Sequence, residues 1–179
     1  MPGAPGASGA TGPAGIGSTG PTGSVGPTGS AGLSSTGPTG PAASTATYAY
    51  IYNLTPQTVA IEADAIFDTN GVITAGITHA PNSPSVLFQV AGDYAITFSV
   101  SGTEPNQFAL FLNGILIPGT VYGSGAGTQQ NTGQVIVTIA AGDTLTLRNH
   151  SSTAAVGLAS LVGGTQANVN ASLLIEKLN

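Results

Sequence analysis

The chain has 179 residues, and only 5% of them are charged: seven acids and two cations give a formal net charge of −5. Two cations are too few for a surface that neutralises nucleic-acid phosphates. The absence of cysteine excludes disulfides, thiolate nucleophiles and thiolate metal sites. No apolar run reaches the roughly 18 to 20 residues of a membrane span, and no signal peptide is apparent. We therefore expect neither a membrane nor nucleic acid as a partner.

Glycine recurs at every third position near the N-terminus. Thirteen of the 27 glycines lie between Gly3 and Gly40, with interruptions at residues 15–17 and 32–37. Three polyproline-II strands need this spacing, because only a hydrogen atom fits at the axis of a collagen triple helix. As an isolated peptide the segment also fits a disordered linker, but attached to a trimeric domain it favours the triple helix. The sequence therefore predicts a collagen-like stalk over residues 1–44 and a homotrimer.

From Ala46 onward, apolar residues alternate with polar or small ones, which is typical of half-buried strands. No stretch shows the 3.6-residue apolar period of a helix. We predict an all-β head over residues 45–179 with roughly eight to ten short strands. The predicted strands lie within residues 48–52, 57–61, 85–90, 94–100, 107–112, 115–118, 134–139, 145–148 and 171–178.

Four turns are predicted between these strands. Ala91-Gly92-Asp93 and Ala141-Gly142-Asp143 each separate two alternating runs, so we expect two hairpins there. Asn70-Gly71 and Asn113-Gly114 offer residues that accept a positive φ, and the second pair is expected to close a tight hairpin.

Three strand sequences carry a resemblance to known proteins. Ser85–Val100 (SVLFQVAGDYAITFSV), Gln134–Arg148 (QVIVTIAAGDTLTLR) and Ala171–Leu178 (ASLLIEKL) resemble strands of the jelly-roll heads of complement-type and tumour necrosis factor-like proteins. With a Gly-Pro-Thr-bearing stalk in front, the chain resembles the collagen-like glycoproteins that cover the exosporium of Bacillus and related spore formers. This resemblance implies a jelly-roll sandwich of two antiparallel sheets that assembles as a homotrimer.

The resemblance also implies a location and a modification. The protein would stand in the hair-like nap of a spore, assembled from inside the mother cell, with sugars on stalk threonines such as Thr22, Thr28 and Thr39. Its N-terminus would attach to a basal-layer or appendage protein. The stalks of the family are usually longer and more regular, and they begin with a Pro-rich leader that is not found before Gly3.

The first and last predicted strands have apolar residues on a second side. Tyr48, Tyr50 and Tyr52 share one side of the first strand, and Leu174 and Leu178 share one side of the last. Strands that are apolar on both sides indicate a second packing partner. We expect both strands in the sheet that faces the threefold axis; the alternative is that the tyrosines belong to the core.

Two similar loops, Gly127–Asn131 and Gly164–Asn168, each precede an apolar strand. Amides presented by loops on a β scaffold suit hydrogen bonds to sugar hydroxyls. The interpretation that we favour is that these amides bind the backbone of their own loops. The candidate ligand residues are Gln129, Gln130, Asn131, Gln166 and Asn168.

The remaining chemistry is sparse. Glu62, Asp64 and Asp68 could converge on Ca²⁺, although solvated acids at a strand edge are the favoured interpretation. His79 and His150 stand in no recognisable pair with an acid and a nucleophilic serine. At residues 123–127 we favour a flexible loop between strands over a phosphate-binding loop, because no helix start and no lysine follow. We expect no metal, no cofactor and no catalytic activity.

Two functions remain open from the sequence. The leading hypothesis is a structural protein of the spore surface, with a trimeric head on a collagen-like stalk. The alternative is a trimeric carbohydrate-binding or adhesive tip, for example of a phage fibre, in which three weak sites gain avidity.

Overall fold

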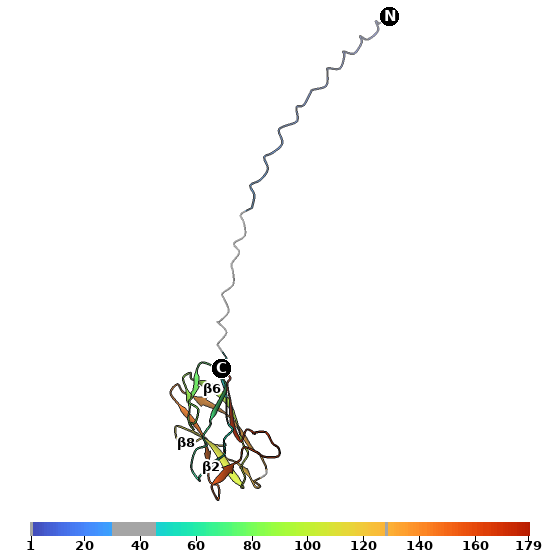
Figure 1. Ribbon diagram of the computed structural model, residues 1–179. Helices are drawn as coiled ribbons and strands as arrows, with labels where there is room; N and C mark the ends of the chain where they lie inside the picture. Colours follow the sequence, from blue (N-terminus) through green and yellow to red (C-terminus); the bar gives the residue numbers. More distant parts are fainter. Residues whose placement is uncertain (1, 30–45, 128) are drawn as a thin grey trace. The chain divides into compact units, whose positions relative to one another are not determined.

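The computed structural model describes residues 2–29, 46–127 and 129–179. The chain divides into two units, Met1–Ala42 and Ala43–Asn179. The predicted boundary between residues 44 and 45 lies outside the described residues. In residues 2–29 the chain forms neither helix nor strand and every residue is exposed (Figure 1). In the part of the chain that the structure describes, no helix is long and apolar enough to cross a membrane.

The head is all-β, as predicted, and the described residues contain thirteen strands rather than eight to ten. Most of the additional strands have only three residues, too few to show a clear alternation. The strands are β1 (Tyr48–Asn53), β2 (Gln57–Val59), β3 (Thr69–Ile73), β4 (Ile77–His79), β5 (Val86–Phe88), β6 (Gly92–Val100), β7 (Asn106–Leu112), β8 (Ile115–Leu116), β9 (Tyr122–Ser124), β10 (Asn131–Ile139), β11 (Thr144–Asn149), β12 (Val156–Leu158) and β13 (Ala171–Lys177).

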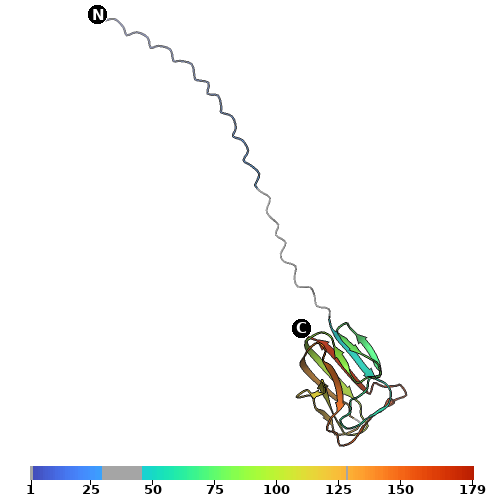
Figure 2. The same ribbon diagram turned by 90° about the vertical axis from the view of Figure 1, so that its left-hand side faces the viewer.

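The strands form two large antiparallel sheets and one small one. The first sheet has the order β10-β6-β13-β1-β3. The second has the order β4-β5-β11-β7-β8, with β9 also paired to β7, and β12 pairs with β2 separately. The first and last strands of the head are therefore neighbours (Figure 2). Tyr50 of β1 lies opposite Leu174 of β13.

The core lies between the inner faces of the sheets. In β6, Tyr94, Ile96, Phe98 and Val100 are at most 1% exposed, and the residues between them face outward. Phe88 of the opposite sheet meets Tyr94 edge-on, with ring centroids 4.8 Å apart. Burying one such side chain contributes roughly 1.5 to 3 kcal/mol, so the alternation seen in the sequence is what holds the two layers together.

The two hairpins predicted at residues 91–93 and 141–143 are wrong. Strand β5 pairs with β4 and β11, whereas β6 pairs with β10 and β13, so the chain crosses from one sheet to the other between Phe88 and Gly92. It crosses again between β10 and β11. Both sheets bury one face in the same core. The alternation of apolar residues is therefore the same whether a turn joins two paired strands of one sheet or connects strands of different sheets.

The two Asn-Gly pairs behave differently. Asn113 and Gly114 have φ values of 52° and 77° and join Leu112 to its partner Ile115, so the predicted tight hairpin is confirmed. The turn predicted at Asn70-Gly71 is wrong, because both residues lie inside β3. A Cβ at Gly71 would lie 3.0 Å from Tyr50 Cδ1, so close packing against that ring favours glycine here.

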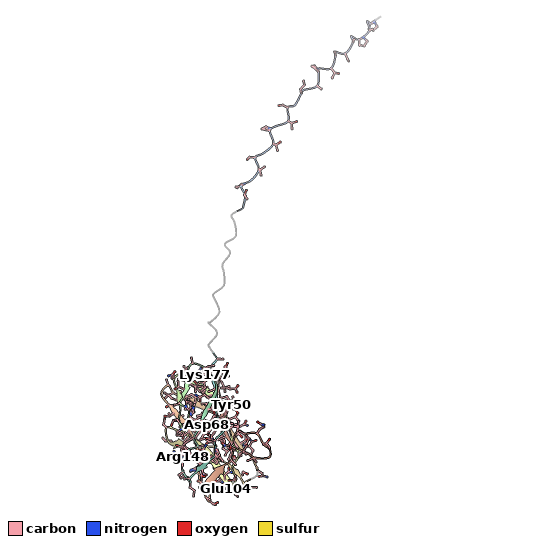
Figure 3. The ribbon with its side chains drawn as sticks, in the orientation of Figure 1. Tyr50, Asp68, Glu104, Arg148 and Lys177 are labelled. Atoms are coloured by element: carbon pink, nitrogen blue, oxygen red, sulfur yellow. The ribbon has the colours of Figure 1, made fainter. Side chains whose placement is uncertain are left out.

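The head has two ends, joined by the nine residues of β6, a span of about 30 Å. At the entry end, where the chain enters the head, Lys177 N–H donates to Thr47 O over 2.8 Å. At the loop end, Ser101 follows β6 and donates its N–H to Asn170 O. The labelled Lys177 and Glu104 mark the two ends (Figure 3).

Candidate functional site

On the outer face of the first sheet, β1 carries three tyrosines and β13 carries Leu174 between Ser172 and Glu176. We call Tyr48, Tyr50, Tyr52 and Leu174 together the tyrosine face. Tyr50 is 37% exposed and Leu174 is 41% exposed, whereas Ala49, Ile51, Leu173 and Ile175 on the inner face are fully buried. The rings of Tyr50 and Tyr52 stack with centroids 5.1 Å apart. Tyr48 and Tyr50 are therefore not core residues, and Tyr52 is half-buried.

Two further exposed apolar residues belong to the same sheet. Ile136 of β10 is 70% exposed and pairs with Ala95 of β6, and Val72 of β3 is 64% exposed. Sequence reasoning missed both, although Ile136 sits at an outward position between Gln134 and Thr138 and could have been found from the alternation. Leu178 follows the end of β13 and is also exposed.

A pocket of about 470 Å³ lies at the loop end. Three loops form it: the loop after β6, the loop between β9 and β10, and the long loop between β12 and β13. Its walls are Ser101, Gly102, Thr103, Gly127, Gln129, Gln130, Val162, Asn168 and Val169. The two amide-bearing loops singled out in the sequence thus meet at one pocket, which spacing along the chain could not reveal.

The five candidate amides divide into two groups. Asn131 is buried and donates to Asn106 Oδ1 and to Tyr122 O, and Asn168 accepts from Val162 N–H and donates to Ala159 O. Gln129, Gln130 and Gln166 are exposed, but Gln166 does not line the pocket.

Other buried asparagines fix the backbone at the same end. Asn53 donates to Asn170 Oδ1 over 2.8 Å, and Asn170 donates to Thr55 O over 3.0 Å. Asn106 donates to Glu104 O over 2.8 Å. Buried amides are costly unless they are hydrogen-bonded, so this network orders the segments around the loops.

The three acids considered for Ca²⁺ do not converge. Asp64 accepts from Arg148 Nε over 2.7 Å, and Glu62 accepts from His150 Nδ1 over 2.9 Å. Asp68 accepts from Leu54 N–H and Thr55 N–H in a third place. No group of three potential metal ligands occurs in residues 2–29, 46–127 and 129–179.

Hydrogen bonds shift the acidity of these groups. The hydrogen bond from His150, aided by Ser151 N–H, lowers the pKa of Glu62. Burial raises the pKa of Asp68, but hydrogen bonds from Thr69 and Thr55 outweigh it, so the net pKa is lowered. The bond to Asp64 raises the pKa of Arg148, which also lies 4.1 Å from the Phe111 ring centroid. These hydrogen bonds therefore favour the ionised forms of Glu62 and Asp68.

The histidines take part in packing and hydrogen bonding. His79 is bonded to Asn70 Oδ1 at 2.6 Å and to Ser83 O at 2.9 Å. His150 meets Phe111 edge-on and Glu62 through Nδ1. Their hydrogen-bond partners include no serine hydroxyl among the described residues.

Of the threonines considered for glycosylation, Thr22 and Thr28 are exposed. Thr39 lies outside the described residues.

The topology of the head is shared with known jelly-roll proteins. The globular domain of zebrafish complement 1qA aligns with a TM-score of 0.57 at 9% identity, over 74% of this chain and 98% of that one. Eiger TNF from S. frugiperda aligns with a TM-score of 0.52 at 12% identity, over 75% and 93%. Murine APRIL aligns with a TM-score of 0.51 at 10% identity, over 75% and 100%. These similarities confirm the predicted jelly-roll fold of the complement and tumour necrosis factor type.

Within that fold, residues 49–179 match the BclA C-terminal domain. The chain therefore belongs to the BclA C-terminal domain family, which confirms the resemblance found in the sequence. A comparison with curated proteins gives no match.

Proposed function

We propose that the protein is a homotrimeric structural component of the spore surface, with its head displayed on a collagen-like stalk in the exosporium nap. Membership of the BclA C-terminal domain family supports this location. We assign the head a structural rather than an enzymatic role, in keeping with its family.

The tyrosine face is the observation that carries the proposal. A single head leaves Tyr48, Tyr50, Leu174 and Ile136 exposed on one sheet, while the opposite face of that sheet is buried along β1, β6 and β13. Exposed apolar residues gathered on one face mark a protein interface rather than a free surface. Three copies that turn this face toward a common axis would bury these side chains together.

The stalk supports the same stoichiometry. A Cβ added at any glycine from Gly3 to Gly29 would meet nothing within 4 Å in a single chain. Steric crowding within one chain therefore does not require glycine at these positions, whereas a triple helix requires glycine at every third residue. Thr22 and Thr28 are exposed and are proposed sugar acceptors, together with Thr39. The N-terminus is the proposed attachment to a basal-layer or appendage protein.

Two measurements test the proposal. Sedimentation equilibrium of the full chain should give a mass three times that of the 17.4 kDa chain. Immunogold labelling of intact spores with an antibody against the head should decorate the outer surface. A monomer at micromolar concentration would contradict the assembly, and gold confined to the spore interior would contradict the location.

A further inference from the structure

We infer that the pocket at the loop end is a binding site for an uncharged saccharide. Its volume of about 470 Å³ lies within the range of about 300 to 1,000 Å³ that is usual for small-ligand sites. Nothing in the structural role proposed above requires a pocket here.

The pocket presents hydrogen-bonding groups that the protein itself does not use. The Ser101 hydroxyl and the Gln130 amide form no hydrogen bond with another described residue, and the side chain of Gln129 has only a 3.5 Å contact with the Ser124 hydroxyl. An amide both donates and accepts, which matches the paired donor and acceptor character of sugar hydroxyls. These groups come from two of the three loops that form the pocket and can bind different hydroxyls of one sugar.

The lining also determines the class of ligand. Val162 and Val169 supply apolar surface for the C–H faces of a sugar ring, and no charged residue lines the pocket. The nearby Glu104 carboxylate is already bonded to Gly157 N–H at 2.7 Å and to the Thr103 hydroxyl at 2.8 Å. An anionic ligand would find no cation here, because Arg148 is paired with Asp64 and Lys177 lies at the entry end.

The walls are held in place before any ligand binds. A Cβ at Gly127 would overlap the Thr103 backbone, so the loop before β10 packs directly against the loop after β6. Asn168 fixes the third wall through Val162 N–H and Ala159 O. A preformed site loses less entropy on binding than one that must first be ordered. An adjoining hollow of about 390 Å³ shares Thr103 and leaves room for a second sugar unit.

The position suits recognition at a surface. The pocket lies at the loop end, and the chain enters the head at the opposite end. In a trimer, three copies would raise a weak affinity by avidity. Only this multivalency rests on the proposed function, because each pocket is built from a single chain.

The test uses the full chain on an array of neutral oligosaccharides, with sialylated and sulfated versions of the same glycans. We expect binding to neutral glycans that Gln130→Ala weakens about three- to tenfold and Gln129→Ala/Gln130→Ala weakens further, as the loss of one and two hydrogen bonds implies. Gln89→Ala is the matched control, since Gln89 is exposed and does not line the pocket.

A second measurement locates the contact. In an NMR titration with a neutral glycan bound on the array, the side-chain amide signals of Gln129 and Gln130 should shift while that of Gln89 stays unchanged. The inference is overturned by binding to no neutral glycan, by binding to charged glycans only, or by equal binding of all variants. Sedimentation of the same samples separates the two proposals, because a monomeric chain that still binds refutes the trimer and leaves the pocket intact.

Discussion

Removing the apolar side chains of the tyrosine face should dissociate the trimer without unfolding the head. The change that we consider is Tyr50→Ser/Leu174→Ser, which alters one residue on each of two paired strands. Both side chains are roughly two-fifths exposed in a single head, at 37% and 41%, so that fraction is what association can still bury.

The magnitude follows from that exposure. Complete burial of such a side chain contributes roughly 1.5 to 3 kcal/mol, so the exposed part of each contributes about 1 kcal/mol on association. Two residues in each of three chains give about 6 kcal/mol per trimer, or about four powers of ten in the association constant. The inner face keeps Ala49, Ile51 and Leu173, so the fold of each head should persist.

The assay is sedimentation velocity over a concentration series, with far-UV circular dichroism to check the fold. The control is Ile115→Ser, which removes an apolar residue that is 74% exposed from the other sheet and should leave the trimer intact. A double variant as trimeric as the wild type would refute the assignment of this face. An equal loss in the Ile115→Ser control would show that the effect is not specific to it.

Three further predictions concern stability and assembly. Folding lowers the pKa of Asp68 below its ordinary 3.8, so the stabilisation by this carboxylate is complete above pH 3.8 and is lost as the pH falls through the folded pKa. When the pH is lowered below about 4, the melting temperature of the wild type should therefore decrease, and that of Asp68→Asn should decrease less. Gly114→Val, at φ 77°, should cost about 1 to 2 kcal/mol in denaturant titrations, whereas Gly125→Val at an open position should cost little. In sedimentation, the isolated head should be trimeric, because it offers an apolar interface, and the isolated stalk should be monomeric, because its repeat is short and interrupted. A monomeric head and a trimeric stalk would show instead that the stalk drives assembly.

The sequence by itself determined the class of the head and the composition of its core. Alternation along β6 placed Tyr94, Ile96 and Phe98 inward, because successive side chains of a strand point to opposite faces of the sheet. The Asn113-Gly114 turn could also be predicted, because its geometry depends on two adjacent residues and their positive φ values.

Only the tertiary structure decided which strands are partners. The turns at residues 91–93 and 141–143 resemble hairpins in sequence, yet each carries the chain from one sheet to the other. Strand pairing depends on contacts between residues that are distant in the sequence. Alternation shows only that one face of a strand is buried, and that face is buried equally well in either of the two sheets.

The candidate sites also divide into residues that could be predicted from the sequence and residues that only the fold brings together. Tyr50 and Leu174 could be singled out as outward apolar residues from alternation alone, and the structure then placed them opposite each other. By contrast, Ser101 and Gln130 come from loops 29 residues apart, and they reach one pocket only because the fold returns both loops to the same end of the head. The periodicity of a strand is encoded locally, whereas the meeting of two loops is set by the path of the whole chain.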